Sequence, residues 1–279
     1  MLTELRIEIA AATSVGRLRR TNADAHLVDE RAGLLAVADG MGDTPRSAAV
    51  AKMALEAVGE SFGEPWRSLP PEERSISEAK ERLLLGVVEA NARLFVPGAK
   101  LSSRGGTTLV AVALSTRHFC VTSVGDSRAY LLRRSSDRLA QLTVDDTVLQ
   151  EDLQAGTPYE VAIAQRDAHA LTRAIGVRPA VHALPFIHRS APGDVLLLCS
   201  DGLSDRVRVE ELGALLAEAE DLERAAHHLI ERAKAGRSGD DVTVVIARRD
   251  GAALITGDET EPPWRSGIRR ITPGAEVQP

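Results

Sequence analysis

The sequence contains few aromatic residues and few cysteines, which limits how the chain can be held together. Only 3% of its 279 residues are Phe, Trp or Tyr, and two are cysteines. Both Cys120 and Cys199 lie within apolar runs, so we interpret them as buried free thiols in a reducing compartment. The core must then be built from Ala, Val, Leu and Ile, and a chain of this length can bury a large one.

Long apolar runs and dense basic runs are missing as well. No segment approaches the roughly 18 uninterrupted apolar residues of a membrane-spanning helix. Residues 1–12 alternate charged with apolar side chains, unlike a signal peptide. The formal net charge of -6 and the lack of a Lys/Arg cluster argue against a nucleic-acid partner. We therefore expect a soluble cytoplasmic protein without membrane or nucleic-acid partners, and the sequence does not indicate its oligomeric state.

The pattern of apolar residues predicts an α+β fold. Strands are expected over residues 5–13, 25–28, 34–38, 108–114, 118–124, 128–132, 181–187, 194–199 and 242–247, and helices over residues 47–59, 72–95, 210–219 and 222–235. Short turns between consecutive strands favour antiparallel pairing. With two helices inserted early and two late, we expect a core of two mainly antiparallel sheets with helices on the outer faces.

Two segments fall outside this regular pattern. Residues 143–180 contain short helical pieces broken by Gly and Pro, and we interpret them as a flap beside the core. Residues 250–279 are rich in Gly, Pro, Thr and Glu with little periodicity, so we expect a disordered tail. The domain is thus predicted over residues 1–249.

A carboxylate at the end of an apolar strand is the most informative feature. Asp39 follows the apolar residues 34–38 and precedes Gly40, which lets the backbone turn sharply. Desolvating a lone carboxylate costs several kcal/mol unless turn amides, a cation or a metal ion satisfy it. A single case is typical of an aspartate bonded by turn amides, but the same pattern returns at Asp126 and Asp201.

Five aspartates share this position beside a predicted strand. They are Asp24, Asp39, Asp126, Asp201 and Asp240. If the two sheets bring these strand ends together, the carboxylates repel one another unless cations neutralise them. Oxygen ligands without clustered His or Cys favour Mg²⁺ or Mn²⁺ over Zn²⁺. Two such ions that share a carboxylate can activate a water molecule for attack on phosphorus, and Arg19 is placed to orient the phosphoryl oxygens.

Eight motifs occur in an order that resembles a known enzyme family. They are Arg19-x-x-Asn22-x-Asp24, Ala38-Asp39-Gly40-Met41-Gly42, Gly106-Thr107-Thr108, Gly125-Asp126-Ser127-Arg128, Leu142-Thr143-x-Asp145, Leu171-Thr172-Arg173-Ala174-Ile175-Gly176, Cys199-Ser200-Asp201-Gly202-Leu203 and Asp240-Asp241-Val242-Thr243-Val244. The set resembles the metal-dependent PP2C-type (PPM) serine/threonine phosphatases in their compact bacterial form, over about residues 5–248. Each motif is weak alone, and their shared order carries the resemblance.

The resemblance implies an α-β-β-α sandwich with a dinuclear Mn²⁺ or Mg²⁺ centre, and a weaker third ion, in the cleft between the sheets. By motif, the resemblance implies that Asp39 bridges the two metals, that the Gly40 carbonyl is a ligand of one of them, and that Asp201 and Asp240 complete the shell of the first metal. It implies Asp126, together with Asp201, as ligands of the third metal. It implies Arg19 as the phosphate-binding residue, and Arg19 and Asp39 as the catalytic residues. Asp24 remains a candidate metal ligand by its strand-end position. The implied substrates are phosphorylated proteins, with a cognate Ser/Thr kinase as a partner, and the family carries its flap at residues 143–180.

Two positions depart from the family pattern. Ala23 stands where the family has a Glu that holds the second metal partly through water, so this metal is expected to bind more weakly. Asp43-Thr44 stands where many bacterial members have Gly-His, and one interpretation gives Asp43 an outer-shell role at the metals. No histidine is evident as a general acid near the metals, so water or another group would protonate the leaving group.

These departures leave other hypotheses open beside an active phosphoserine/phosphothreonine phosphatase. One is a catalytically weak or inactive pseudophosphatase that binds phosphoproteins and regulates without turnover. Another, metal-dependent hydrolysis of nucleic-acid phosphodiesters, uses the same metals but lacks a basic binding surface. A serine hydrolase has little support, because Ser200 is not in a Gly-x-Ser-x-Gly motif.

Overall fold

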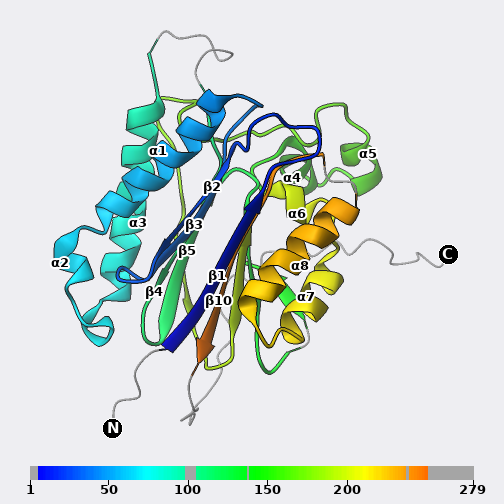
Figure 1. Ribbon diagram of the computed structural model, residues 1–279. Coiled ribbons are helices and arrows are strands. Elements are labelled where there is room, and N and C mark those ends of the chain that lie inside the picture. Colours follow the sequence, from blue (N-terminus) through cyan, green and yellow to red (C-terminus); the bar gives the residue numbers. More distant parts are fainter. Residues whose placement is uncertain (1–5, 98–104, 137, 237–238, 251–279) are drawn as a thin grey trace.

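The computed structural model describes residues 6–97, 105–136, 138–236 and 239–250, which contain two five-stranded antiparallel sheets packed face to face (Figure 1). The first sheet has the strand order β1 (Arg6–Ser14), β10 (Val242–Asp250), β9 (Val195–Cys199), β6 (Arg128–Leu132) and β7 (Leu139–Gln141). The second has the order β2 (Asp24–Asp29), β3 (Leu34–Asp39), β4 (Leu109–Leu114), β5 (His118–Val124) and β8 (Phe186–Arg189).

A pair of helices covers the outer face of each sheet (Figure 1). The second sheet is covered by α1 (Pro45–Ser61) and α3 (Ile76–Leu94), and the first by α7 (Val209–Ala217) and α8 (Leu222–Ala235). The shorter helices are α2 (Glu64–Arg67), the 3-10 helix η1 (Pro71–Glu73), α4 (Val148–Gln154), α5 (Tyr159–Ile163) and α6 (Asp201–Ser204). The expected α-β-β-α sandwich is confirmed.

Strand β3 shows why the central strands are apolar throughout. Leu34, Ala36 and Ala38 pack beneath α1 and α3, whereas Leu35 and Val37 pack between the two sheets. All five side chains are fully buried. A strand that is covered on both faces requires an apolar side chain at every position. The small alanines on the helix side also let α1, itself rich in alanine, approach the sheet closely.

Strand pairing brings the predicted site residues to one end of the sandwich, at the top of Figure 1. Asp24 and Asp39 are direct partners at the start of β2 and the end of β3. In the other sheet, the end of β9 pairs with the beginning of β10. Asp201 follows β9 after one intervening residue, and Asp240 closely precedes β10, so these two residues lie at the same end as well.

The prediction of a strand over residues 181–187 was wrong for residues 181–185, because β8 begins at Phe186, directly after Pro185. Proline has no N–H group to donate to β5. The chain before it is held by α3 instead, where the Nδ2 of Asn91 donates to the carbonyl oxygen of Arg178 at 3.0 Å.

The predicted flap lies outside the sandwich layers. The segment of residues 143–180, between β7 and β8, forms α4, α5 and turns. Asp250 ends β10, and the remainder of the predicted tail, residues 251–279, lies outside the described residues. None of the described helices combines the length and the apolar character needed to cross a membrane.

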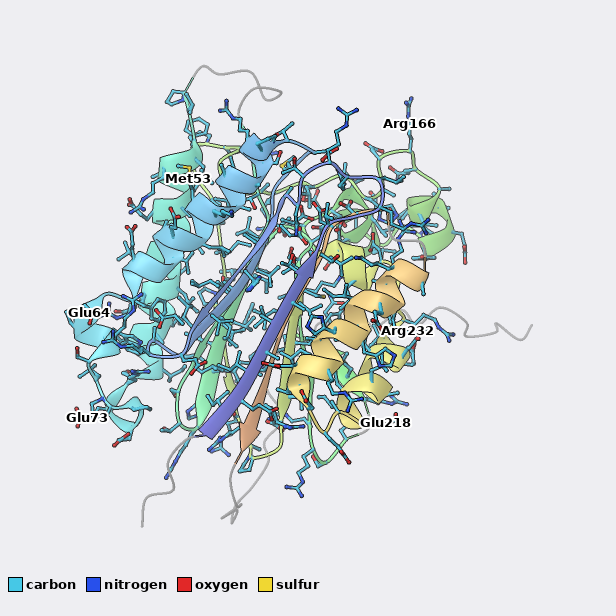
Figure 2. All side chains as sticks on the ribbon, in the orientation of Figure 1. Met53, Glu64, Glu73, Arg166, Glu218 and Arg232 are labelled. Atoms are coloured by element: carbon cyan, nitrogen blue, oxygen red, sulfur yellow. The ribbon has the colours of Figure 1, made fainter. Side chains whose placement is uncertain are left out.

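Trp66 on α2 anchors a region remote from the flap. Its side chain is fully buried, its Nε1 donates to the carbonyl oxygen of Ala32 at 2.9 Å, and its ring meets Phe62 edge-on with 5.6 Å between centroids. Figure 2 shows that Glu64, on the same helix, lies on the far side of the molecule from Arg166 of the flap.

We predict that Trp66→Ala lowers the free energy of unfolding by about 3–5 kcal/mol, because a large buried ring is replaced by a cavity. The activity per folded molecule should not change. Urea unfolding and an active-fraction assay check both statements. Trp66→Phe keeps most of the ring and loses only the hydrogen bond, so its loss should be clearly smaller. Equal losses in the two variants would contradict the packing argument.

Candidate metal centre

A cavity of about 190 Å³ lies at the end of the sandwich where the strand ends meet, and we name it the carboxylate cavity. It is lined by Arg19, Ala23, Asp39, Gly40, Met41, Gly42, Thr108, Asp126, His169, Leu171, Asp201 and Asp240. The structure thus brings together Arg19 and five of the six predicted metal-binding residues. The sixth, Asp24, is buried beside its strand partner Asp39.

The main chain of Asp39 is held by two threonines. Its N–H donates to the Oγ1 of Thr108 at 2.9 Å, and its carbonyl oxygen accepts from the N–H of Thr108 at 2.9 Å and from the hydroxyl of Thr107 at 2.8 Å. The Oγ1 of Thr108 also lies 2.6 Å from the hydroxyl of Ser127. The threonine pair therefore fixes Asp39 and links it to the loop that carries Asp126.

Gly40 permits a close crossing of three backbone segments. Its N–H donates to the carbonyl oxygen of Ala23 at 3.1 Å. A Cβ atom at this position would lie 2.2 Å from the carbonyl oxygen of Ser47 and 2.9 Å from that of Ala23. No side chain fits there, so glycine is required for Asp39 to sit next to the first turn of α1.

Asp24 and Ser200 form a buried pair in the interior beside Asp39. The Oγ of Ser200 donates to the Oδ2 of Asp24 at 2.7 Å and accepts from the N–H of Thr243 at 3.0 Å. Both side chains are buried. The hydroxyl of Ser200 is therefore committed to joining β2 to β10, and only the next residue, Asp201, reaches the cavity.

Two adjacent aspartates before β10 have different roles. Asp240 lines the cavity and accepts from Arg19, with Nε to Oδ1 at 2.7 Å and Nη2 to Oδ2 at 2.6 Å. Asp241 is buried and accepts the backbone N–H groups of Gly16 at 2.8 Å and Ala23 at 2.7 Å. Asp241 was not among the predicted site residues. It fixes the loop that carries Arg19, and the repeated Asp in its motif was the one available signal.

The turn that positions Asp126 is tied to the flap. Gly125 has a φ of 99°, and its N–H donates to the Oδ2 of Asp146 at 3.0 Å. The N–H of Asp146 donates in turn to the carbonyl oxygen of Gly125 at 2.9 Å. Asp146 also forms an ion pair with Arg173. Asp146 thus connects both ends of the flap to the turn beside Asp126.

Burial and mutual repulsion raise the pKa of the clustered carboxyl groups. Burial raises the pKa of Asp24 to about 7, and Asp201 and Asp241 add to the effect through their charges. Burial followed by neighbouring carboxylates also raises the pKa of Asp126 to about 7 and that of Asp201 to about 6. The pKa of Asp39 lies well above its ordinary value for the same reasons. As anions, these groups require nearby cations.

The donor set fits Mg²⁺ or Mn²⁺. The Oδ1 atoms of Asp24 and Asp201 are buried and have no hydrogen-bond partner among the described residues, so their lone pairs remain for an ion or its water shell. Across the described ranges, no three His, Cys, Asp or Glu side chains enclose one ion. Mg²⁺ usually keeps several waters and takes only one or two carboxylates. Ions that share Asp39 and complete their shells with water are compatible with this arrangement.

The departures from the family pattern have separate structural consequences. Ala23 is 3% exposed and lines the cavity, so this position supplies no carboxylate oxygen. Thr44 is the N-cap residue of α1. Asp43 accepts the N–H groups of Arg20 at 2.9 Å and of the next residue at 3.1 Å. Asp43 thus ties the loop beside Arg19 to the entry of α1, which differs from the outer-shell interpretation.

One lining residue is a histidine that the sequence did not reveal as a neighbour of the candidate metal ligands. His169 of the flap lines the same cavity as Asp39 and Asp201. It belongs to none of the eight motifs and has no metal-binding spacing to another histidine. Only the folded flap places it there, so the sequence offered no signal for it.

Comparisons with known proteins agree with this geometry. The sequence profile of the family described as Protein phosphatase 2C matches residues 17–235. The serine/threonine phosphatase stp of Listeria innocua is 31% identical over 248 residues, which are 85% of this chain and 94% of that protein. The serine/threonine protein phosphatase PstP of Mycobacterium tuberculosis is 32% identical over 244 residues, which are 86% of this chain and 45% of that protein.

The fold is shared with solved structures of the same kind. The catalytic domain of PstP in complex with two manganese ions has a TM-score of 0.72 and 30% identity, covering 88% of this chain and all of that one. The two-sheet sandwich with a carboxylate cavity at one end and these matches together indicate a metal-dependent phosphatase. The chain belongs to the protein phosphatase 2C family.

The raised pKa values predict how the stability of the metal-free protein depends on pH. The folded state retains protons on Asp24 and Asp126 up to about pH 7, whereas carboxyls with the ordinary value of 3.8 have already lost them. The folded state thus binds more protons than the unfolded chain in this window, so these groups make the free energy of unfolding fall as pH rises.

We expect the protein in EDTA to have a lower Tm at about pH 8 than at about pH 5, and Mn²⁺ to raise the Tm more at the higher pH. Thermal scans with and without Mn²⁺ measure this. Asp126→Asn removes one titrating group and should flatten the pH dependence in EDTA. A Tm in EDTA that rises steadily over this range would argue against buried, repelling carboxylates.

Proposed function

We propose that the chain hydrolyses phosphoserine and phosphothreonine residues of proteins, with Mn²⁺ or Mg²⁺ as the cofactor. The observation that carries the proposal is the convergence of Asp39, Asp126, Asp201 and Asp240 with Arg19 in one cavity. Clustered carboxylates require cations, and bound cations together with a guanidinium attract a phosphate group. The manganese-bound structure of PstP supports the same cofactor for this chain.

The cavity residues divide the work of holding the ions. Asp39, the carbonyl of Gly40, Asp201 and Asp240 would hold two ions, and Asp126 with Asp201 a third. When bound, the ions supply an activated water and neutralise charge on the phosphate. The contribution of the chain is preorganisation, because the main-chain hydrogen bonds of Asp39 fix the backbone that carries its carboxylate before substrate arrives.

Arg19 can contact a phosphate while it remains bonded to Asp240. A guanidinium has five N–H groups, and two hydrogen bonds go to Asp240. The side chain of Arg19 is 29% exposed and that of Asp240 is 33% exposed, so a phosphate that enters the cavity can reach the guanidinium of Arg19. The two-point bond to Asp240 also orients the guanidinium plane, which favours paired hydrogen bonds to phosphoryl oxygens.

The size and charge of the site favour a phosphorylated side chain as the substrate. A cavity of about 190 Å³ is smaller than the roughly 300–1,000 Å³ of pockets that enclose whole small molecules. The net charge of -6 gives little attraction for a polyanion, which disfavours nucleic-acid phosphodiesters. The pseudophosphatase alternative is disfavoured because Asp39, Asp201 and Asp240 are all present in the cavity.

The proposal includes a cellular setting. A Ser/Thr kinase would supply the phosphorylated proteins, and the chain would act in the cytoplasm. The free, buried Cys120 and Cys199 support a reducing compartment. Burial raises the pKa of both thiols to about 12, so they are inert at neutral pH.

Asp39→Asn tests the central ligand. An amide removes one charge at nearly constant size, so we expect kcat toward a phosphothreonine peptide to fall by about 10²–10³-fold, as when one preorganised electrostatic contact is lost. Calorimetry should show weaker Mn²⁺ binding. Glu56→Gln, on the exposed face of α1, makes the same chemical change away from the cavity and should alter neither quantity. Near-normal turnover by Asp39→Asn would reject the assignment.

A folded, unaltered protein that releases no phosphate at saturating Mn²⁺ would reject the enzyme itself. If that protein still bound phosphopeptides, the pseudophosphatase would be the better description.

Ala23→Glu tests whether the missing family carboxylate weakens the second metal. The new side chain would enter a buried position beside Asp39 and Asp240. We expect a lower Tm in EDTA, because a further anion is crowded into the cluster. In Mn²⁺ we expect tighter binding of the weaker ion and higher activity at low Mn²⁺. Calorimetry and metal titration of activity measure both. Unchanged Mn²⁺ affinity would separate this position from the second metal site.

A further inference from the structure

His169 lies in the flap, but its backbone position is fixed. The N–H of Leu149 donates to the carbonyl oxygen of Ala168 at 2.8 Å, and the N–H of Val148 donates to that of Ala170 at 3.0 Å. The residues on both sides of His169 are therefore bonded to the first turn of α4. An anchored main chain of this kind can present a side chain reproducibly.

His169 borders the carboxylate cavity on its solvent side. His169 and Leu171 are separated by one residue, and both line the cavity. His169 is exposed, whereas Asp39 and Asp201 are only partly exposed. Figure 2 shows its flap neighbour Arg166 projecting away from the sandwich. Within the flap, then, Arg166 points away from the sandwich, whereas His169 is exposed and lines the cavity.

A substrate must place its leaving oxygen near this entrance. A volume of about 190 Å³ accepts a phosphate and the start of a side chain, but not the peptide that carries them. Arg19, together with cations that the carboxylates would hold, would draw the phosphate inward. The Ser or Thr oxygen that joins phosphate to peptide therefore points outward, toward the side that carries His169.

The leaving oxygen needs a proton, because a serine or threonine alkoxide is strongly basic. A positioned general acid typically contributes about 10²–10⁴-fold to such a step. Among the cavity-lining side chains, Arg19 keeps its proton at any physiological pH, and the aspartates would be ligands of the cations. Histidine is the side-chain type that exchanges a proton near neutral pH. Among the described residues that line this cavity, His169 is the one histidine.

We propose that His169 is the catalytic general acid of this phosphatase, an inference that rests on the proposed function. The bond between phosphorus and the Ser or Thr oxygen breaks as a bond forms between phosphorus and the oxygen of water. The imidazolium of His169 gives its proton to the leaving oxygen, which departs as the alcohol. The attacking water releases a proton to solvent, and the imidazole regains one from solvent. The charged side chains that share the cavity with it are Arg19, Asp39, Asp126, Asp201 and Asp240.

The test compares leaving groups in His169→Gln, which keeps a polar side chain of similar length but cannot donate a proton as an acid. The full-length protein saturated with Mn²⁺ is assayed with a phosphoserine peptide and with a series of substituted phenyl phosphates that ends in p-nitrophenyl phosphate. We expect kcat to fall by about 10²-fold or more for the peptide. It should change by less than about threefold for p-nitrophenyl phosphate, whose anion leaves without a proton. The dependence of kcat on leaving-group basicity should steepen.

Three results would overturn the proposal. An equal loss with good and poor leaving groups would indicate a structural role for His169. Unchanged turnover of the phosphopeptide would show that another group supplies the proton. Weaker Mn²⁺ binding by His169→Gln in calorimetry would place the imidazole at the metals instead.

The control variant is His182→Gln, which changes another exposed histidine outside the cavity lining and should leave every rate unchanged. The activity of the unaltered protein distinguishes a failure of the proposed phosphatase function from a failure of the assignment of His169. If it turns over phosphate with Mn²⁺ but His169→Gln shows no leaving-group effect, only the assignment of His169 fails. If the unaltered protein has no Mn²⁺-dependent activity, the proposed function fails, and the assignment falls with it.

Discussion

Repulsion among buried carboxylates is the constraint around which this end of the molecule is built. Asp39, Asp126 and Asp201 share a small cavity, and burial together with their mutual charges raises the pKa of each. Such a cluster is unfavourable in a protein that only has to fold. It becomes favourable when cations neutralise it, so the energetic cost of the empty cluster is also the source of metal affinity.

The surrounding structure holds these anions in place by fixing the backbone. Threonine hydroxyls bond the main chain of Asp39, while Asp241 and Asp146 accept N–H groups from the loops beside Arg19 and Asp126. Aspartate thus serves two purposes here. Some carboxylates accept backbone N–H groups, whereas the Oδ1 of Asp201, a residue of the cavity lining, has no hydrogen-bond partner among the described residues.

The departures from the family pattern change the chemistry more than the architecture. Thr44 still provides a helix cap and Asp43 a loop contact, so the fold tolerates both residues without the Gly-His pair. Ala23 removes one oxygen donor from the cavity wall. The flap contributes His169 to the cavity lining, so the proposed proton donor comes from a flap residue that belongs to none of the eight motifs.

The sequence by itself determined the layers and most of the cavity residues. Continuous apolar runs such as β3 require burial on both faces, and Asp39, Asp126 and Asp201 could be found because local patterns place them at strand ends. Only the tertiary structure showed that Asp241 accepts the backbone N–H groups of Gly16 and Ala23 and brought His169 to the cavity. The identity of a residue is local information. Whether one of two neighbouring carboxylates accepts backbone N–H groups or lines a cavity depends on segments more than 200 positions away in the sequence.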